Sequence, residues 1–270
     1  MRIIKIKKRN GGERIIYAPN HREKARLRLM VPALNDRVLN ECDPNIVHGF
    51  VPGKSPVTNA LKHVGYQFTL SMDLKDFFGS VRPYHIGSVP LLTKHCFIYS
   101  KNNKIKNLAP QQGLPTSPAI ANLAGIVLDT KIKSVTELHK CIYTRYADDL
   151  SISGNDINDL ILIRNDMKRI VEECGFTLND RKTRIQSSSF GRRNITGVMV
   201  DDKNIYPTRA IKRKLRAARH QGHNHHAKGL AEWCKLKTPN PNGSQRISKV
   251  QKAVARHAGR VLVGVKNVWL

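Results

Sequence analysis

The segment YTRYADDLSIS, residues 143–153, places two adjacent carboxylates inside a run that otherwise has the composition of a β-strand. Tyr, Thr, Leu and Ile favour extended backbone, whereas Asp is depleted in strands. The like charges of Asp148 and Asp149 also raise the affinity of each carboxylate for protons. A bound divalent cation would compensate such a pair, and it would require further ligands elsewhere in the chain.

The segment FTLSMDL, residues 68–74, alternates apolar and polar side chains and predicts a half-buried strand. Asp73 closes this strand and lies on its polar side. Residues 116–132 carry apolar side chains at helical spacing, with Ser117 as the expected N-cap and Pro118 as the first helical residue. These segments predict a strand followed by a helix.

Two short extended runs, 141–146 and 150–153, flank the acidic pair and predict a hairpin with both carboxylates at its tip. An amphipathic helix follows over residues 160–174 and is expected to stop at Gly175. Residues 176–180 are expected to resume a strand. The order strand, helix, hairpin, helix, strand predicts a split β-α-β, ferredoxin-like sheet with helices on one face.

In this arrangement the end of the first strand and the tip of the hairpin lie side by side, because adjacent strands are about 5 Å apart. We therefore expect Asp73, Asp148 and Asp149 at one polar edge, where they would hold two Mg²⁺ ions for in-line phosphoryl transfer. The alternative is a solvated turn with an unrelated strand-end acid, which is the better reading of an isolated Asp-Asp pair. The surrounding motifs favour the metal site.

The charge of the chain points to a polyanionic partner. Lys and Arg number 47 against 20 Asp and Glu, a formal charge of +27, which favours nucleic acid, with an anionic membrane as the runner-up. No run approaches the roughly 20 apolar residues of a membrane-spanning helix, and the basic N-terminus lacks the apolar region of a signal peptide. Five scattered cysteines without a CxxC motif predict reduced thiols in the cytosol. Residues 201–270 hold 16 Lys and Arg against three acidic residues and predict a basic C-terminal subdomain.

Three motifs, DLKDFF, QGLPTSPAIAN and YADD, occur in this order and together resemble the catalytic core of a reverse transcriptase. The similarity runs over roughly residues 13–220. The resemblance implies an α+β, right-hand polymerase with fingers, a ferredoxin-like palm and a helical thumb. The implied boundaries are fingers at 1–66 and 80–110, palm at 67–79 and 111–205, and thumb at 206–270.

A finer resemblance is to bacterial retron reverse transcriptases. The segment NALKH matches the Asn-Ala-x-x-His element of that group at Asn59 and His63, and NITG stands where those enzymes have Val-Thr-Gly. Leu114 replaces the usual Ala after QG, and Gly79 replaces the usual Pro after DFF. A group II intron-like or diversity-generating reverse transcriptase is the alternative that these two elements argue against.

The resemblance assigns roles by position. Asp73, Asp148, Asp149 and the main-chain carbonyl of Leu74 are the implied metal ligands, and Lys182 is the implied general acid for the leaving group. The residues implied to contact the incoming deoxynucleotide are Phe78 as a sugar gate, Gln112, Gly113, Lys24 and Arg28. Core packing is the alternative for one of the two adjacent phenylalanines, and a solvated side chain is the alternative for Lys182.

Nucleic-acid contacts are expected at two places. The retron-like elements place Asn59, His63, Thr196 and Gly197 near template or RNA, with a structural turn and a capped helix as the alternative. A C-terminal amphipathic helix is expected to present a row of cations to a phosphate backbone, namely Lys249, Lys252, Arg256 and Arg260. The histidines between His220 and His226 favour RNA contact over zinc, because their spacing fits no familiar zinc site.

These assignments predict a cytoplasmic bacterial enzyme that copies part of a cognate structured non-coding RNA into single-stranded DNA. The resemblance implies priming from an RNA 2′-OH, consumption of dNTPs, contact with an RNA–DNA hybrid, and a partner effector protein in defence against phage, without a membrane. The alternative of another class is a non-catalytic RNA-binding scaffold. The intact acidic set argues against a scaffold, because uncompensated acids repel a polyanion.

Overall fold

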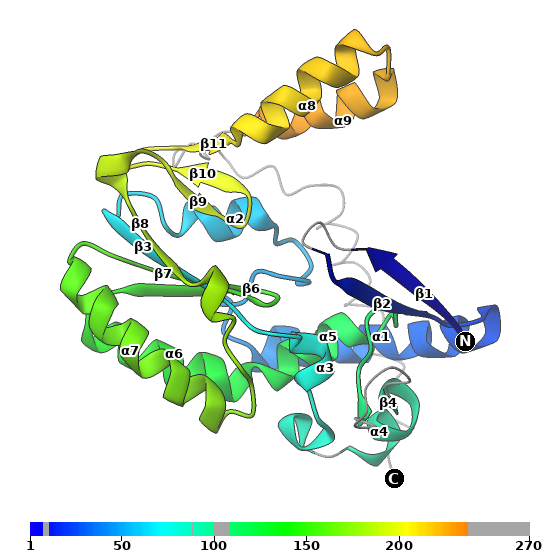
Figure 1. Cartoon of the computed structure of the whole chain (residues 1–270). Coiled ribbons are helices and arrows are strands. Elements are labelled where there is room, and N and C mark those ends of the chain that lie inside the picture. The colour runs from blue at the N-terminus through cyan, green and yellow to red at the C-terminus, as the bar shows by residue number, and fades with distance from the viewer. Residues whose placement is uncertain (8–10, 88, 100–107, 237–270) are drawn as a thin grey trace. The chain divides into compact units, whose positions relative to one another are not determined.

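The computed structural model describes residues 1–7, 11–87, 89–99 and 108–236 (Figure 1), which lie in one compact unit, Met1–Lys237. The predicted C-terminal cations Lys249, Lys252, Arg256 and Arg260 lie outside the described residues. The predicted boundaries of fingers, palm and thumb stay predictions.

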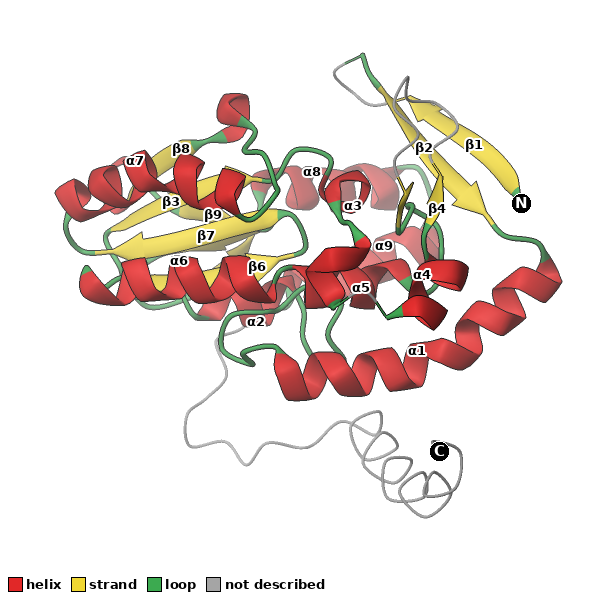
Figure 2. Cartoon of the chain, turned by 90° about the horizontal axis from the view of Figure 1, so that it is seen from below, coloured by secondary structure: helices red, strands yellow, loops and turns green. Residues whose placement is uncertain are grey.

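A four-stranded antiparallel sheet forms the centre of this unit. Its strands, in spatial order, are β6 (Ile142–Tyr146), β7 (Asp149–Gly154), β3 (Phe68–Asp73) and β8 (Arg184–Ser187). Helices α6 (Ile126–Leu138) and α7 (Ile157–Glu173) run along one face of the strands (Figure 2). This strand order is that of a split β-α-β sheet, so the predicted ferredoxin-like arrangement is confirmed.

Helix α7 follows its predicted pattern. Its N-cap Asp156 accepts a hydrogen bond from the Asn158 N–H at 2.8 Å, and Gly175 ends the helix region in the left-handed conformation at φ 78°. One stripe of α7 is buried against the sheet, made of Leu160, Ile163, Met167, Ile170 and Val171. Burial of this stripe fixes which face of the helix meets the strands.

Two predicted elements differ in the structure. The helix expected over 116–132 is two helices, α5 (Ser117–Ala124) and α6, which divide at Gly125, and the N-cap of α5 is Thr116 instead of Ser117. A side-chain carbon at Gly125 would lie 2.6 Å from the guanidinium of Arg145, so this buried group excludes any larger residue there. The strand expected at 176–180 begins only at Arg184, because the earlier residues form a turn that extends the end of β3.

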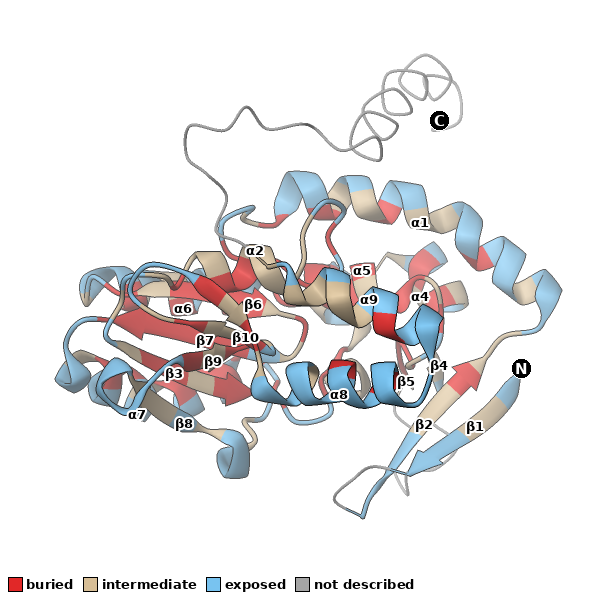
Figure 3. Cartoon of the chain, turned by 90° about the horizontal axis from the view of Figure 1, so that it is seen from above, coloured by how far each residue is buried: buried red, intermediate tan, exposed pale blue. Residues whose placement is uncertain are grey.

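The other face of the central sheet is covered by a short helix and a small three-stranded sheet (Figure 3). These elements are α2 (Pro56–Leu61), β9 (Arg193–Ile195), β10 (Val198–Val200) and β11 (Ile205–Pro207). They share a small apolar core made of Ala60, Ile195, Val198, Val200 and Ile205. This cover buries polar residues of β3 and β7, and the alternating pattern of β3 gave no sign of it.

The N-terminal elements and several connections lie beyond one end of the central sheet (Figure 2). They are β1 (Arg2–Lys7), β2 (Glu13–Ala18), α1 (His21–Glu41), α3 (Phe77–Ser80), η1 (Pro83–Ile86), α4 (Pro90–Cys96), β4 (Ile98–Tyr99) and β5 (Leu108–Ala109). Two 3₁₀ turns, η2 (Asp180–Lys182) and η3 (Ser188–Phe190), flank β8. Helix α1 begins with a capping box in which Asn20 and Glu23 satisfy each other's backbone N–H groups.

The described chain ends in two packed helices, α8 (Arg209–His220) and α9 (Asn224–Cys234). Leu215, Ala218 and Ala227 form the contact between them. All five cysteines fall in the described part, and each is a free thiol, as predicted. Within the described residues, every helix is too short or too polar to cross a membrane.

Candidate active site

The three acids meet at the edge of the central sheet. Asp73 is the last residue of β3 and Asp149 the first residue of β7, and the two are directly paired across the strands. Asp148 precedes Asp149 in the turn, where its carbonyl accepts a hydrogen bond from the Leu74 N–H at 2.9 Å. Asp73 and Asp148 are 75 positions apart in the sequence, and the pairing of β3 with β7 brings them together.

The acids repel one another electrostatically. The pKa of Asp149 is raised to about 6, first because neighbouring protein displaces water and then because Asp148 and Asp73 are negatively charged. The pKa of Asp148 is raised for the same first reason, with Asp73 adding to the effect. The side chain of Asp149 is exposed, so water screens part of this repulsion.

Asp73 is the most enclosed of the three acids, with 5% of its surface exposed. Its Oδ1 accepts a hydrogen bond from Lys182 Nζ at 2.7 Å, and its Oδ2 accepts one from Asn179 Nδ2 at 3.1 Å. The hydrogen bond to Asp73 raises the pKa of Lys182, which keeps the ammonium group protonated. The predicted general acid therefore lies against a predicted metal ligand.

The tip of the acidic hairpin is held in a strained conformation. Ala147 has a positive φ of 57°, which costs a residue with a Cβ atom of order 1–3 kcal/mol and persists only where its surroundings enforce it. Gly49 lies against this backbone so closely that a Cβ atom there would be 2.3 Å from Ala147 N. Residues 46–48 also pair in parallel with β6, through the Arg145 N–H to Ile46 O at 2.8 Å and the His48 N–H to Arg145 O at 2.9 Å.

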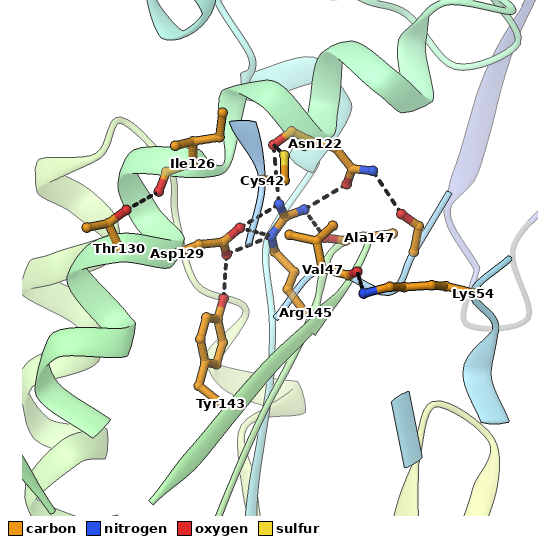
Figure 4. A network of polar contacts seen from close by, with 11 residues as sticks. Cys42, Val47, Lys54, Asn122, Ile126, Asp129, Thr130, Tyr143, Arg145 and Ala147 are labelled. Atoms are coloured by element: carbon orange, nitrogen blue, oxygen red, sulfur yellow. Dashed lines mark hydrogen bonds and ion pairs between the residues drawn. The ribbon is translucent and has the colours of Figure 1, made fainter. Parts of the chain in front are cut away.

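A buried ion pair lies beneath this hairpin (Figure 4). The fully buried guanidinium of Arg145 donates to Asp129 from Nε at 2.8 Å and from Nη2 at 2.7 Å. The same group donates to Asn122 Oδ1 at 3.1 Å and to Ala147 O at 3.4 Å, while the Tyr143 hydroxyl donates to Asp129 at 2.8 Å. The pair thus connects α6 to the strained turn that carries Asp148.

A polar cavity of about 180 Å³ opens beside the acids. Its lining includes Asp149 and Ser71 from the central sheet, together with Arg184, Asn194, Thr196 and Gly197. Asn194 Oδ1 accepts the Gly197 N–H at 3.1 Å, which fixes the turn between β9 and β10. Two predicted nucleic-acid-binding residues, Thr196 and Gly197, therefore line the same cavity as Asp149.

The structure separates the two adjacent phenylalanines. Phe77 is 3% exposed and packs on Phe176 in the core, whereas Phe78 is half-buried and makes an edge contact with Phe50 at 6.0 Å between ring centroids.

Gly113 has φ 105°, and a Cβ atom there would lie 2.5 Å from Tyr17 O.

Other predicted nucleotide contacts come from the N-terminal elements. The carbonyl of Gln112 accepts the Tyr17 N–H at 2.7 Å, which ties this segment to β2. Lys24 and Arg28 are exposed on α1, where both cationic ends are open to solvent.

Asn59 and His63 are interior residues, which corrects their assignment as nucleic-acid contacts. Neither side chain is exposed, because α2 packs on the central sheet. The His63 ring bridges Thr144 Oγ1 at 2.7 Å and Ser153 Oγ at 2.8 Å, and burial lowers its pKa to about 3, so the ring is neutral. Asn59 Nδ2 donates to Thr196 Oγ1 at 3.3 Å. The alternative of a structural role therefore holds for both residues.

The sequence analysis missed a basic helix. Six cations of α8 are exposed and form no ion pair with any described residue: Arg209, Lys212, Arg213, Lys214, Arg216 and Arg219. Figure 3 shows most of α8 as exposed surface. The run KRKLRAAR was the available signal, but the expected cation row was assigned to residues further along the chain.

The acids are a suitable donor set for a divalent cation, although they are not gathered around one point. Carboxylate oxygens suit hard divalent ions. The pKa of Asp149 is raised first by desolvation and then by the negative charges of Asp148 and Asp73, which such an ion would neutralise. Within the described ranges, no group of three or more His, Cys, Asp or Glu side chains is placed so that it could hold a metal ion, and this includes His220–His226. The ammonium of Lys182 is the cation that Asp73 contacts here.

Comparison with known proteins identifies the family. The sequence profile described as "Reverse transcriptase (RNA-dependent DNA polymerase)" matches residues 6–203. The retron Ec86 reverse transcriptase of Escherichia coli is 32% identical over 225 residues, which cover 81% of this chain and 69% of that protein. This chain belongs to the family of bacterial retron reverse transcriptases.

Another relative, the retron Mx65 reverse transcriptase of Myxococcus xanthus, is 33% identical over 276 residues, which cover 92% of this chain. The match spans 63% of the length of that relative. Membership of the reverse transcriptase family implies a divalent metal ion as cofactor.

Solved structures share the fold. Telomerase from Candida albicans superimposes with a TM-score of 0.58 at 14% identity, covering 77% of this chain and 46% of that one. The foamy viral protease–reverse transcriptase superimposes with a TM-score of 0.54 at 15% identity, covering 94% and 39%. The predicted α+β right-hand polymerase fold is thereby confirmed.

We expect Asp129→Asn to lower the free energy of unfolding by about 3–5 kcal/mol, because it leaves the charge of Arg145 buried without a counter-charge. Urea denaturation measures the change. Glu173→Gln, which removes the charge from the exposed ion pairs of Glu173 with Lys131 and Arg169, is the control and is expected to have little effect. An equally small effect for Asp129→Asn would show that the buried pair does not support the hairpin.

We expect Asp149→Asn to stabilise the fold at pH 8. The pKa of Asp149 is raised in the folded chain, so wild-type stability falls as the pH rises through the interval between about 4 and about 6. The gain from the variant is therefore full above pH 6 and vanishes below pH 4. Urea denaturation at pH 8, 6 and 4 measures it, with the exposed Asp36→Asn on α1 as control. A gain that does not depend on pH would contradict the repulsion among the acids.

Proposed function

We propose that this chain copies part of a cognate structured RNA into single-stranded DNA, as an RNA-directed DNA polymerase of the retron type. The observation that carries the proposal is the direct pairing of Asp73 with Asp149, which brings the acids of two distant motifs to one sheet edge. Family membership and the polar cavity beside these acids support it.

In the proposed chemistry Asp73, Asp148, Asp149 and the carbonyl of Leu74 hold Mg²⁺, with two ions in the complete site. When bound, the metal lowers the pKa of the attacking hydroxyl and neutralises charge on the triphosphate. Lys182 Nζ keeps its proton beside Asp73 and would deliver it to the pyrophosphate leaving group.

The substrate side of the proposal uses residues that face solvent. Phe78, the more exposed of the two phenylalanines, would exclude a 2′-OH on the incoming nucleotide and so select dNTPs. Gln112 and Gly113 would contact that nucleotide, and Lys24 and Arg28 would reach its phosphates. We place the growing end of the nucleic-acid strand in the cavity next to Asp149.

RNA and the RNA–DNA hybrid would bind through cations, with the exposed face of α8 as the described contributor. We also propose a cognate non-coding RNA as the template and a 2′-OH of that RNA as the primer, as the resemblance to retron reverse transcriptases implies. We further propose a cytoplasmic bacterial setting and a partner effector protein in defence against phage.

The test is expression of the chain together with the DNA that flanks its gene, followed by a search for a small branched RNA–DNA species. Asp148→Asn is expected to abolish this product while RNA binding persists, because the variant loses a metal ligand but no RNA contact. Asp202→Asn, an exposed acid outside the site, is the control. Product formation by Asp148→Asn would exclude the assigned role, and wild-type chain that binds RNA without any product would favour a scaffold.

We expect the triple variant Lys212→Ala, Arg213→Ala and Arg216→Ala to weaken RNA binding uniformly across RNA sequences. Each lost phosphate contact reduces the slope of log Kd against log salt concentration by about 0.7–0.9, so three contacts reduce it by about 2–3. Titrations at several salt concentrations measure the slope. Arg164→Ala with Lys168→Ala, on the exposed side of α7, is the control. An unchanged slope in the triple variant would remove α8 from the RNA-binding surface.

A further inference from the structure

A turn formed by residues 177–182 is attached to the end of β3 by its backbone. The Asn179 N–H donates to Asp73 O at 2.8 Å, and the Lys75 N–H donates to Thr177 O at 2.8 Å. Leu178 forms a β-bridge with Leu74 between these two bonds. The backbone of the turn is therefore fixed relative to Asp73 before any side chain is considered.

Two side chains from this turn share the carboxylate of Asp73, one oxygen each. Asn179 Nδ2 donates a hydrogen bond to Oδ2 at 3.1 Å, and Lys182 Nζ donates one to Oδ1 at 2.7 Å. The Asn179 side chain is short, neutral and half-buried, so the backbone bond at the same residue keeps its amide in place. The Lys182 side chain is long and 57% exposed, so its ammonium exchanges readily with another cation.

The other two acids have no comparable support. Among the described residues, no side chain donates a hydrogen bond to the carboxylate of Asp148 or Asp149, although the Asp148 carboxylate accepts a hydrogen bond from the backbone of its own residue. Asp73 is therefore the one acid of the three that other side chains orient, and Asn179 is the shorter and less exposed of the two side chains that do so. Hydrogen-bonded partners of this kind fix the orientation of metal-binding side chains and tune their affinity.

We propose that Asn179 is a positioning residue for the metal site. Its amide holds Oδ2 of Asp73, so Oδ1, now on Lys182, is the oxygen that would be offered to a divalent cation held together with Asp148 and Asp149. This inference rests on the proposed metal-dependent function. Asn179 donates to the carboxylate through its amide, so the residue contributes a fixed orientation and no ligand.

The probe is Mn²⁺ alone, titrated into the full chain without nucleotide or RNA and followed by electron paramagnetic resonance of the free ion. Asn179→Ala is expected to raise the Kd for Mn²⁺ by about 10–100-fold, the range typical of a lost supporting hydrogen bond. It is expected to raise the Mg²⁺ concentration needed for half-maximal DNA synthesis in parallel. Asn165→Ala, an exposed Asn on α7, is the matched control and should leave the Kd unchanged. Thermal unfolding curves that coincide with wild type establish that both variants fold.

Two further variants separate the possible failures. Asp73→Asn is expected to lose Mn²⁺ binding; unchanged binding in this variant would overturn the proposed metal site itself. If Asp73→Asn loses binding while Asn179→Ala keeps the wild-type Kd, the positioning role alone is wrong. Asn179→Asp cannot donate and repels Asp73, so we expect it to bind Mn²⁺ no better than Asn179→Ala. Tighter binding by Asn179→Asp would make residue 179 a ligand and overturn its positioning role.

Discussion

The ion pair between Arg145 and Asp129 supports the geometry of the whole catalytic edge. Both groups are almost completely buried, so their attraction is little screened, and loss of either partner would leave a bare charge in the core. Because the same guanidinium also binds Ala147 O, it joins the helix layer to the turn that carries Asp148. The strain at Ala147 and the repulsion among the acids are tolerated because this anchor is made elsewhere in the chain.

The sequence was sufficient for the features that depend on local pattern. Strand alternation, helical periodicity and the turn at Gly175 predicted the order of the central elements, and that order brought Asp73 next to Asp149. Strand pairing has a fixed spacing, so the position of these acids followed once the topology was right. The division of the helix at Gly125 was missed, and the group that requires a glycine there, the side chain of Arg145, lies 20 residues further along.

Features that depend on contacts between distant segments were not predictable. His63 lies in a motif that resembles an RNA-binding element, but its partners Thr144 and Ser153 come from two strands 81 and 90 residues away. Asn179 had no signal of its own, because its role follows from a turn that extends β3. Arg145 stands in a strand where an inward-facing charge could be recognised only once its counter-ion on α6 was located.

The hydrogen bond from Asn59 to Thr196 joins two short motifs that are 137 residues apart. Arg193 adds to this contact, since it donates hydrogen bonds to His63 O at 2.9 Å and to Thr69 Oγ1 at 2.8 Å. The two motifs are thus held together by direct hydrogen bonds and form one contact region. A chimera that receives only α2 or only the β9–β10 hairpin from a different polymerase would lose the hydrogen bonds between them. Domain exchange among these enzymes therefore has to transplant both segments together.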